Sequence, residues 1–400
     1  MTRPILIQTE DADLNPAEKR ETGQDKGQDK GQIQLINEGA YGCIYHPGIS
    51  CRGTQENPNY ITKIQKSTNI TDNEKAISDI IRDKIPGYDR YFAPIVKQCN
   101  VKIARRFIPD IQKCKVFQND TEEEIESSTY VSNKVRYLGK QTIQDYFIRL
   151  AQSPDFWSTL IETHLRLLEI VEALLDADLI HMDLKPNNVI IDQTAKTTAR
   201  PIVIDFGISI HRANFDPQKA FYVYDTYTPW CIDIVLCNYS VHRIANAAAQ
   251  TVSSTDIDEA LNVFKYGAKT IAKVHSSTTP IHNRVFSTTL FSQEDKNALE
   301  ESIRGYLKQT YVDRKSTWAQ LYSDMVSRTY TTWDNYSLSL LYMEILESVY
   351  LQIEMTPFLR PYLAILKSTV YVEPPKRLSI ADTRKALVQL LVQVQEEEEE

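Results

Sequence analysis

The sequence lacks any apolar run approaching the roughly 18 residues that a membrane-spanning helix requires. Residues 1–11 carry acids where a signal peptide would have a basic start and an apolar stretch. These two absences predict a soluble protein that is neither secreted nor in contact with a membrane. We therefore expect it to act inside the cell.

An excess of positive charge is also absent. The chain has 45 Lys and Arg residues against 53 Asp and Glu residues, which gives a formal net charge of -8. Proteins that bind nucleic acid through its phosphates gain affinity from clustered basic side chains, because these release counterions. We therefore expect no direct contact with nucleic acid.

Cysteines at the close spacing of a metal site are missing as well. No CxxC or Cys/His spacing occurs that would give zinc its four ligands. Because cytosolic proteins rarely form disulfides, we expect free thiols in a reducing compartment. The six cysteines are Cys43, Cys51, Cys99, Cys114, Cys231 and Cys237.

Aromatic residues are absent from residues 1–31, which end within the repeat GQDKGQDKGQ. This arm cannot bury enough apolar surface to offset the entropy of ordering, so we expect it to be disordered. The glutamates of 396–400 repel one another and are expected to form a solvated tail. The chain as a whole is 42% hydrophobic over 400 residues, which is sufficient for one large core or two moderate lobes.

Short runs of alternating apolar residues after the arm are typical of β-strands. One helix interrupts them, because apolar residues at helical spacing over 72–85 stop at Pro86, which cannot continue a helix. A polar loop with an acidic cluster at 122–126 precedes the last strand. The predicted strands lie at 33–35, 44–45, 60–64 and 130–138.

Beyond residue 138 the pattern is mainly helical, beginning with Leu and Ile at helical spacing over 156–180. A strand-rich half with one helix, followed by a helix-rich half, predicts an α+β protein with two lobes. We place the small antiparallel β-sheet lobe at 32–138 and the larger helical lobe at 139–395.

The densest polar motif is HMDLKPNN at 181–188, directly after the long predicted helix. Asp183 lies five positions before Asn188 on this short loop. A carboxylate placed there can accept a proton from a hydroxyl group, while the amide oxygen binds a metal. The number of matching polar positions favours a catalytic loop over a plain polar turn.

A second motif, DFG at 205–207, follows an apolar strand predicted at 202–204. Asp205 can reach a cation bound to phosphates, and Gly207 lets the backbone turn sharply behind it. A lone DFG is common by chance. Its position 22 residues after Asp183 makes it significant.

Two further features indicate nucleotide binding. Gly39 and Gly42 in NEGAYGCIY would let backbone N–H groups approach phosphates, although a plain hairpin would need glycine too. Lys63 on the next strand can neutralise phosphates if a carboxylate fixes its position. Glu74 in the following helix is preferred to Asp79 for this role because it has the longer reach.

These four segments occur in the order, and at roughly the spacing, of the eukaryotic protein kinase superfamily, which the chain resembles over residues 33–392. The variants YITKIQ, KVRYLGKQTIQDYF, HMDLKPNNVIID and VIDFGIS are similar to those of divergent serine/threonine kinases encoded by large double-stranded DNA viruses. The resemblance implies a two-lobed kinase fold, ATP with Mg²⁺ or Mn²⁺, protein substrates with Ser or Thr, and a location in the host cytoplasm or the virion.

The resemblance also assigns roles by position. Asp183 would be the catalytic base, and Lys185 would contact the transferring phosphate, as in serine/threonine kinases. Asn188 and Asp205 would hold magnesium. The residues implied in nucleotide binding are Gly39, Gly42, Ile44, Lys63, Glu74, Arg136, Leu138 and Ile190.

Residues 134–139 resemble the hinge between the lobes of the family. The backbone of Arg136 and Leu138 would hydrogen-bond adenine, and Val135 would stand at the gatekeeper position. The apolar walls around the base would come from Ile44, Ile61, Ile190 and Ile204.

Several positions depart from the family pattern. Met182 replaces an arginine that usually binds a phosphorylated activation loop, so we expect activity without that phosphorylation. No Ala-Pro-Glu follows the DFG motif, which leaves Arg377 without the acid it would pair with. Asp334 in WDNYSL is expected to anchor the catalytic loop from the central helix, with Asp233 as the alternative.

About a hundred residues separate Trp230 from Asp334, more than the family has there. The helical pattern of 257–272 and 293–307 predicts an inserted helical segment at 241–330, on which substrates or partners would dock.

Two other functions stay open. A pseudokinase scaffold would explain Met182 and the missing Ala-Pro-Glu, but every catalytic position is present. A small-molecule kinase of the aminoglycoside or choline type shares the HxDxxxxN spacing, but Lys185 and the YSL segment favour a protein substrate.

Overall fold

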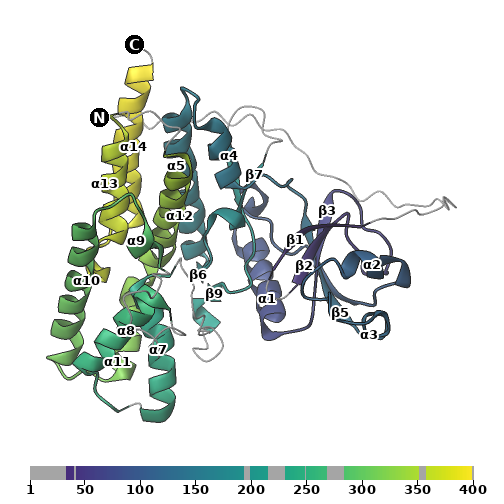
Figure 1. Cartoon of the computed structure of the whole chain (residues 1–400), viewed down its shortest axis with the longest axis horizontal. Helices are drawn as coiled ribbons and strands as arrows, with labels where there is room; N and C mark the ends of the chain where they lie inside the picture. The colour runs from purple at the N-terminus through teal and green to yellow at the C-terminus, as the bar shows by residue number, and fades with distance from the viewer. Residues whose placement is uncertain are drawn as a thin grey trace. The chain divides into compact units, whose positions relative to one another are not determined.

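The computed structural model describes residues 33–39, 42–192, 199–214, 230–247, 249–267, 283–350 and 357–398. It is an α+β protein, in which a five-stranded antiparallel sheet precedes a mainly helical part (Figure 1). The α+β class predicted from the sequence is confirmed. The arm predicted at 1–31 lies outside the described residues.

The sheet has the strand order β1-β2-β3-β5-β4, with each neighbouring pair antiparallel. Successive side chains of a strand point to opposite faces. On β3, Ile61 and Lys63 therefore line a cleft, whereas Ile64 is buried on the other face. Four strands were predicted, and β4 was not. The strands are β1 (Gln34–Glu38), β2 (Gly42–His46), β3 (Tyr60–Gln65), β4 (Lys97–Val101) and β5 (Tyr130–Arg136).

The helix predicted between the strands is α1 (Asn69–Lys84). It begins slightly earlier than predicted, because Thr68 and Thr71 form a capping box at its N-terminus. It ends just before Pro86, as the sequence indicated. Ile77 and Ile81 on its inner face are buried.

Two short helices, α2 (Ile108–Ile111) and α3 (Glu122–Ser127), lie on the other side of the sheet from α1 (Figure 1). The prediction of a single helix in this half is therefore wrong. The acidic cluster at 122–126, predicted to be a loop, forms α3. Thr121 caps this helix, and acidic side chains are favourable at a helix N-terminus.

The helices α2 and α3 and the segment between them cover one face of the sheet. Phe107, Phe117 and Ile125 are fully buried there with Cys43 and Tyr45 of β2, in a core separate from that of the helical part. The Tyr45 hydroxyl donates to the Ile111 carbonyl at 3.2 Å. The face of the sheet that bears Lys63 is left to line the cleft.

Two disulfides cross-link the sheet-containing part of the chain, so the prediction of six free thiols is wrong. The joined cysteines have Cα atoms 6.2 and 5.8 Å apart, within the range that a disulfide spans. They are far apart in sequence, and only the sheet brings them together. The bonds join Cys43 to Cys114 and Cys51 to Cys99, and Cys231 and Cys237 are free and buried.

The helical part is built around α12 (Trp333–Val349), whose residues from Trp333 to Met343 are all buried. Helices α4, α5 and α13 contact it. Two short strand pairs, β6 with β9 and β7 with β8, present the polar loops to the cleft. The remaining elements are α4 (Ile143–Leu150), α5 (Phe156–Asp176), β6 (Leu179–Ile180), β7 (Val189–Asp192), β8 (Arg200–Val203), β9 (Ile210–His211), α7 (Ile232–Ala247), α8 (Ser254–Tyr266), α9 (Arg284–Ser287), α10 (Gln293–Leu307), α11 (Trp318–Asp324), α13 (Leu359–Val370) and α14 (Ile380–Glu398).

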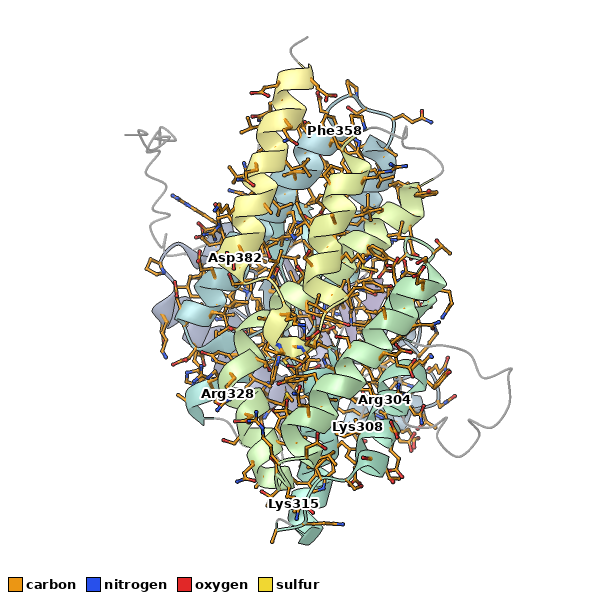
Figure 2. The ribbon with its side chains drawn as sticks, turned by 90° about the vertical axis from the view of Figure 1, so that its left-hand side faces the viewer. Arg304, Lys308, Lys315, Arg328, Phe358 and Asp382 are labelled. Carbon is orange, nitrogen blue, oxygen red and sulfur yellow. A yellow bond between two sulfur atoms is a disulfide. The ribbon has the colours of Figure 1, made fainter. Side chains whose placement is uncertain are left out.

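The segment 241–330 is helical over most of its described residues, and its buried side chains join the core of the helical part. Helix α10 has the bounds predicted for it, and α8 covers the first part of the stretch predicted at 257–272. Figure 2 labels Arg304, which donates to Asp258 of α8 at 2.9 Å. Docking of partners on this segment stays a prediction.

The C-terminal helix α14 continues through Glu398, so the prediction of a separate tail at 396–400 is wrong for its first three residues. Glu396 and Glu397 are exposed, as expected of charged side chains. Among the described helices, none combines the length and apolar character needed to cross a membrane.

Candidate functional site

A cleft of about 350 Å³ lies between the sheet and the helical part. Its walls come from β1, β2 and β3 on one side and from β7 and the residues 204–206 that follow β8 on the other. Eleven residues that the sequence predicted for this site are among those that line it. They are Ile44, Ile61, Lys63, Glu74, Val135, Arg136, Leu138, Asn188, Ile190, Ile204 and Asp205.

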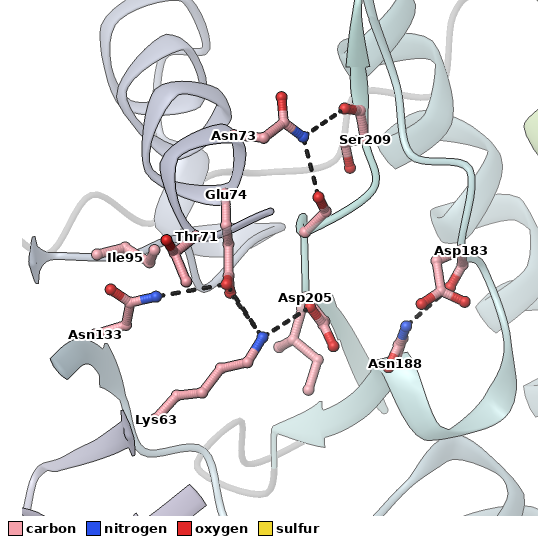
Figure 3. A network of polar contacts seen from close by, with 12 residues as sticks. Lys63, Thr71, Asn73, Glu74, Ile95, Asn133, Asp183, Asn188, Asp205 and Ser209 are labelled. Carbon is pink, nitrogen blue, oxygen red and sulfur yellow. Dashed lines mark hydrogen bonds and ion pairs between the residues drawn. The ribbon is translucent and has the colours of Figure 1, made fainter. Parts of the chain in front are cut away.

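Lys63 pairs with two carboxylates at once (Figure 3). Its Nζ lies 3.1 Å from Glu74 Oε2 and 3.3 Å from Asp205 Oδ1. The preference for Glu74 as its partner is confirmed, since Asp79 pairs with Lys75 and not with Lys63. Lys63 thus joins β3, α1 and the DFG motif in one polar cluster.

Burial and charge work against each other in this cluster. Burial disfavours the charge on Lys63, but the carboxylates of Asp205 and Glu74 outweigh it and raise the lysine's pKa. Burial raises the pKa of Glu74 despite the attraction of Lys63. Burial would also raise the pKa of Asp205, but Lys63 lowers it below its usual range. Asp205 keeps 42% of its side chain exposed, so its carboxylate remains accessible.

Two asparagines that the sequence reasoning missed hold this cluster in place. Asn133 of β5 is fully buried and donates to Glu74 Oε2 at 3.4 Å. Asn73 donates to the carbonyls of Gly207 and Ser209 at 3.0 Å each (Figure 3). These bonds fix α1 to the segment after the DFG motif. Neither asparagine stands in a recognisable local motif.

Asp183 lies on the loop between β6 and β7, outside the residues that line the cleft. The Nζ of Lys185 is 2.9 Å from Asp183 Oδ1 and 3.1 Å from Oδ2. Burial raises the pKa of Asp183 to about 6, although Lys185 opposes this shift. A carboxylate with such a pKa is well suited to accept a proton near neutral pH.

Asp334 of α12 holds this loop from below, as predicted in preference to Asp233. Its two oxygens accept the N–H groups of His181 at 2.7 Å and Met182 at 3.0 Å. His181 is neutral, because burial lowers its pKa to about 4. Its Nδ1 accepts the Asp183 N–H at 3.2 Å, and its Nε2 lies 3.2 Å from the Ile204 carbonyl.

Asn188 and Asp205 could hold a divalent cation at the inner end of the cleft. The amide nitrogen of Asn188 donates to the Asp183 carbonyl at 3.0 Å, which leaves its amide oxygen as the atom to face a metal. An amide oxygen and a carboxylate are ligands that Mg²⁺ accepts. Elsewhere in the described chain, Glu38, Cys43 and Cys114 lie close together, but the disulfide occupies both cysteines.

Gly39 follows β1 and Gly42 begins β2, and the Gly39 N–H donates to the Gly42 carbonyl at 2.8 Å. A Cβ added to Gly42 would lie 2.5 Å from the Ile64 carbonyl oxygen, so only glycine fits against β3. Packing is thus a sufficient reason for this glycine. Neither glycine lines the cleft, and a phosphate-binding role for them stays a prediction.

Of the segment 134–139 that was predicted to hold adenine, residues 135–139 line the cleft, and so does Lys140 after it. The Tyr137 N–H donates to the Asn59 carbonyl at 2.9 Å, which fixes the backbone between the two predicted contact residues. Arg136 and Leu138 both line the cleft. Ile44 of β2 and Ile190 of β7 line the cleft from its two sides.

Arg377 has an acidic partner, contrary to the prediction. Its Nη2 donates to Asp233 Oδ2 at 2.6 Å in a pair that is almost fully buried. Asp233 stands in the first turn of α7, outside any Ala-Pro-Glu motif, which is why the sequence pattern did not indicate it. Three residues earlier, Trp230 Nε1 donates to the Met182 carbonyl at 2.9 Å, a contact that the sequence did not predict.

No protein-family model matches this sequence, and a search of curated proteins finds no match.

Proposed function

We propose that this chain is a serine/threonine protein kinase that transfers the γ-phosphoryl group of ATP to protein hydroxyls. The observation that carries the proposal is the simultaneous pairing of Lys63 with Glu74 and Asp205 at the cleft. A lysine fixed in this way is preorganised to meet phosphate oxygens. A buried lysine that only stabilised the fold would need one carboxylate partner, and not a second, exposed one such as Asp205.

On this proposal the sheet and the helical part are the two lobes of a kinase fold, and the cleft between them takes ATP. The apolar residues Ile44 and Ile190 would sandwich adenine, and the backbone of Arg136 and Leu138 would hydrogen-bond its edge. Lys63 would then neutralise the phosphates toward the inner end of the cleft.

The reaction is an in-line displacement at the γ-phosphorus. A bond forms from the substrate hydroxyl oxygen to phosphorus as the bond to the β,γ-bridging oxygen breaks, and ADP leaves. Asp183 accepts the hydroxyl proton, and Lys185 stabilises charge on the transferring group. Mg²⁺ held by Asn188 and Asp205 would offset negative charge on the phosphates when bound.

Lys185 also supports the choice of substrate. Its ammonium lies against Asp183, where the acceptor hydroxyl and the phosphoryl group would meet. This position resembles serine/threonine kinases, so we propose that the acceptors are Ser and Thr. Since Met182 replaces the arginine that would read a phosphorylated loop, phosphatase treatment is expected to leave the activity intact.

The test is transfer of labelled phosphate from ATP with magnesium to mixed protein substrates and to the protein itself. Wild type is expected to yield phosphoserine or phosphothreonine, and Asp205→Ala to yield neither. Asp183→Asn should lower kcat at least about a hundredfold with little change in ATP affinity, the scale of a lost general base. Asp176→Asn, at the exposed end of α5, is the matched control.

ATP binding without transfer to any substrate would contradict the proposal and support a pseudokinase scaffold. Label appearing on a small hydroxylated molecule and not on protein would instead support the small-molecule kinase alternative.

A further inference from the structure

The peptide group between Met182 and Asp183 is held at both ends. The Met182 carbonyl accepts a hydrogen bond from Trp230 Nε1 at 2.9 Å, and the Asp183 N–H donates to His181 Nδ1 at 3.2 Å. Because this peptide is bonded to the Asp183 Cα, its orientation sets the direction in which the carboxylate leaves the backbone.

The backbone at Met182 does not adopt this shape by itself. Its φ of 67° lies in the left-handed region, which a residue with a Cβ rarely adopts without support. One support is the Asp334 carboxylate, which binds the Met182 N–H at 3.0 Å. The other is the indole of Trp230, on the carbonyl side.

Water cannot take over the role of the indole. Met182 is 1% exposed and Trp230 is 4% exposed, so the carbonyl would be left unpaired without the indole N–H. A buried acceptor without a partner is unfavourable, and the peptide is expected to rotate to find one. That rotation would move the Asp183 carboxylate.

We infer that Trp230 is a positioning residue for Asp183. By donating to the Met182 carbonyl, it fixes the orientation of the peptide group that sets the direction of the Asp183 carboxylate. The inference rests on the proposed function, since it concerns the base of that reaction. Trp230 precedes α7, whose first turn is fixed by the buried pair of Asp233 with Arg377. The neutral hydrogen bond from Trp230 therefore holds the loop at Met182, the residue that stands where the family has an arginine.

The decisive variant places benzothienylalanine at position 230, which keeps the shape of the indole but has sulfur in place of N–H. We expect kcat to fall about 10- to 100-fold, as for a small misplacement of a catalytic group. The KM for ATP should stay within about twofold, because Trp230 does not line the cleft. Trp230→Phe should act in the same direction.

Amide exchange supplies a readout that does not require turnover. The Asp183 amide is expected to exchange faster in both Trp230 variants than in wild type. The peptide group between Met182 and Asp183 would then keep its bond to His181 but lose its bond to Trp230. Trp318→Phe is the control, since Trp318 is fully buried and its Nε1 has no hydrogen-bond partner among the described residues. It should change neither kcat nor this exchange rate.

An active wild type whose benzothienylalanine variant keeps both kcat and the Asp183 exchange rate would overturn this inference alone. The inference would also fail if the KM for ATP rose in step with the loss of kcat, or if Trp318→Phe produced an equal loss. A wild type without any phosphoryl transfer would overturn the proposed function and, with it, the positioning role.

Discussion

Arg377 and Asp233, which lie 144 residues apart in sequence, form an ion pair with side-chain exposures of 1% and 0%. A guanidinium and a carboxylate buried so completely depend on each other, because either one alone would be an uncompensated charge in a low-dielectric core. The pair ties the start of α7 to the segment before α14.

Removing one member of this pair should destabilise the protein strongly. Arg377→Met is expected to lower the free energy of unfolding by about 3–5 kcal/mol, the usual range for breaking a buried pair. Urea denaturation measures it. The double variant Arg377→Met/Asp233→Leu should regain most of the loss, since neither charge is then stranded.

The control for that experiment is an exposed pair. Arg328, labelled in Figure 2, is 75% exposed and lies 3.4 Å from Asp324. Arg328→Met should change stability by no more than about 1 kcal/mol. Equal losses from Arg328→Met and Arg377→Met would refute the importance given to burial.

If the proposed function holds, the rate of phosphoryl transfer should depend on pH through Asp183. Only the ionised carboxylate accepts a proton, and burial raises its pKa to about 6, so kcat/KM should rise as the pH increases through about 6. Lys185 lowers this pKa, so Lys185→Met should move the acid limb to higher pH. A pH–rate profile measures both, with Lys308→Met as the control. An acid limb that stays in place in Lys185→Met would exclude this electrostatic coupling.

Glu74 and Asp79 lie on the same helix, yet on the proposed function their substitution should affect kcat/KM for ATP differently. Glu74→Gln removes the carboxylate that fixes Lys63, so kcat/KM for ATP is expected to fall at least about tenfold, the scale of a lost charge-assisted bond. Asp79→Asn touches only Lys75 and Arg82, and should leave the rate within about twofold. Steady-state kinetics at varied ATP would decide, and equal effects would argue against the role given to Glu74.

Reduction of the two disulfides should destabilise the sheet half of the protein. They close loops with separations of 71 and 48 residues, and loss of such a bond typically costs about 2–5 kcal/mol. Urea denaturation with and without a thiol-free reductant measures this cost. A variant with alanine at Cys43, Cys114, Cys51 and Cys99 should show no response to the reductant. If the wild type showed no response either, the bonds would contribute nothing.

Elements governed by local signals were predictable from the sequence. Helix α10 was predicted from its helical pattern with its observed bounds, and the structure adds a capping box of Ser292 and Asp295 at its start. The start of α3 carries the same signal in Thr121 and Glu124, which the charge of the cluster obscured.

Features that depend on long-range contacts were not predictable in the same way. The disulfide between Cys43 and Cys114 requires β2 to meet a segment 71 residues away, and no spacing rule encodes that meeting. The bond from Trp230 to the Met182 carbonyl likewise exists only because α7 and the loop are packed together. The pairing of Lys63 with Glu74 was predictable because a lysine that neutralises phosphates needs a carboxylate to fix its position.

The anchoring of the loop by Asp334 has a consequence for the order of synthesis. Asp334 follows His181 by 153 residues, so a ribosome adding about 5–20 residues per second completes the loop roughly 8 to 30 s before its anchor emerges. During that interval the nascent chain contains His181 and Met182 without the carboxylate that binds their N–H groups. A product released before α12 would therefore carry the sequence of the loop without its anchor.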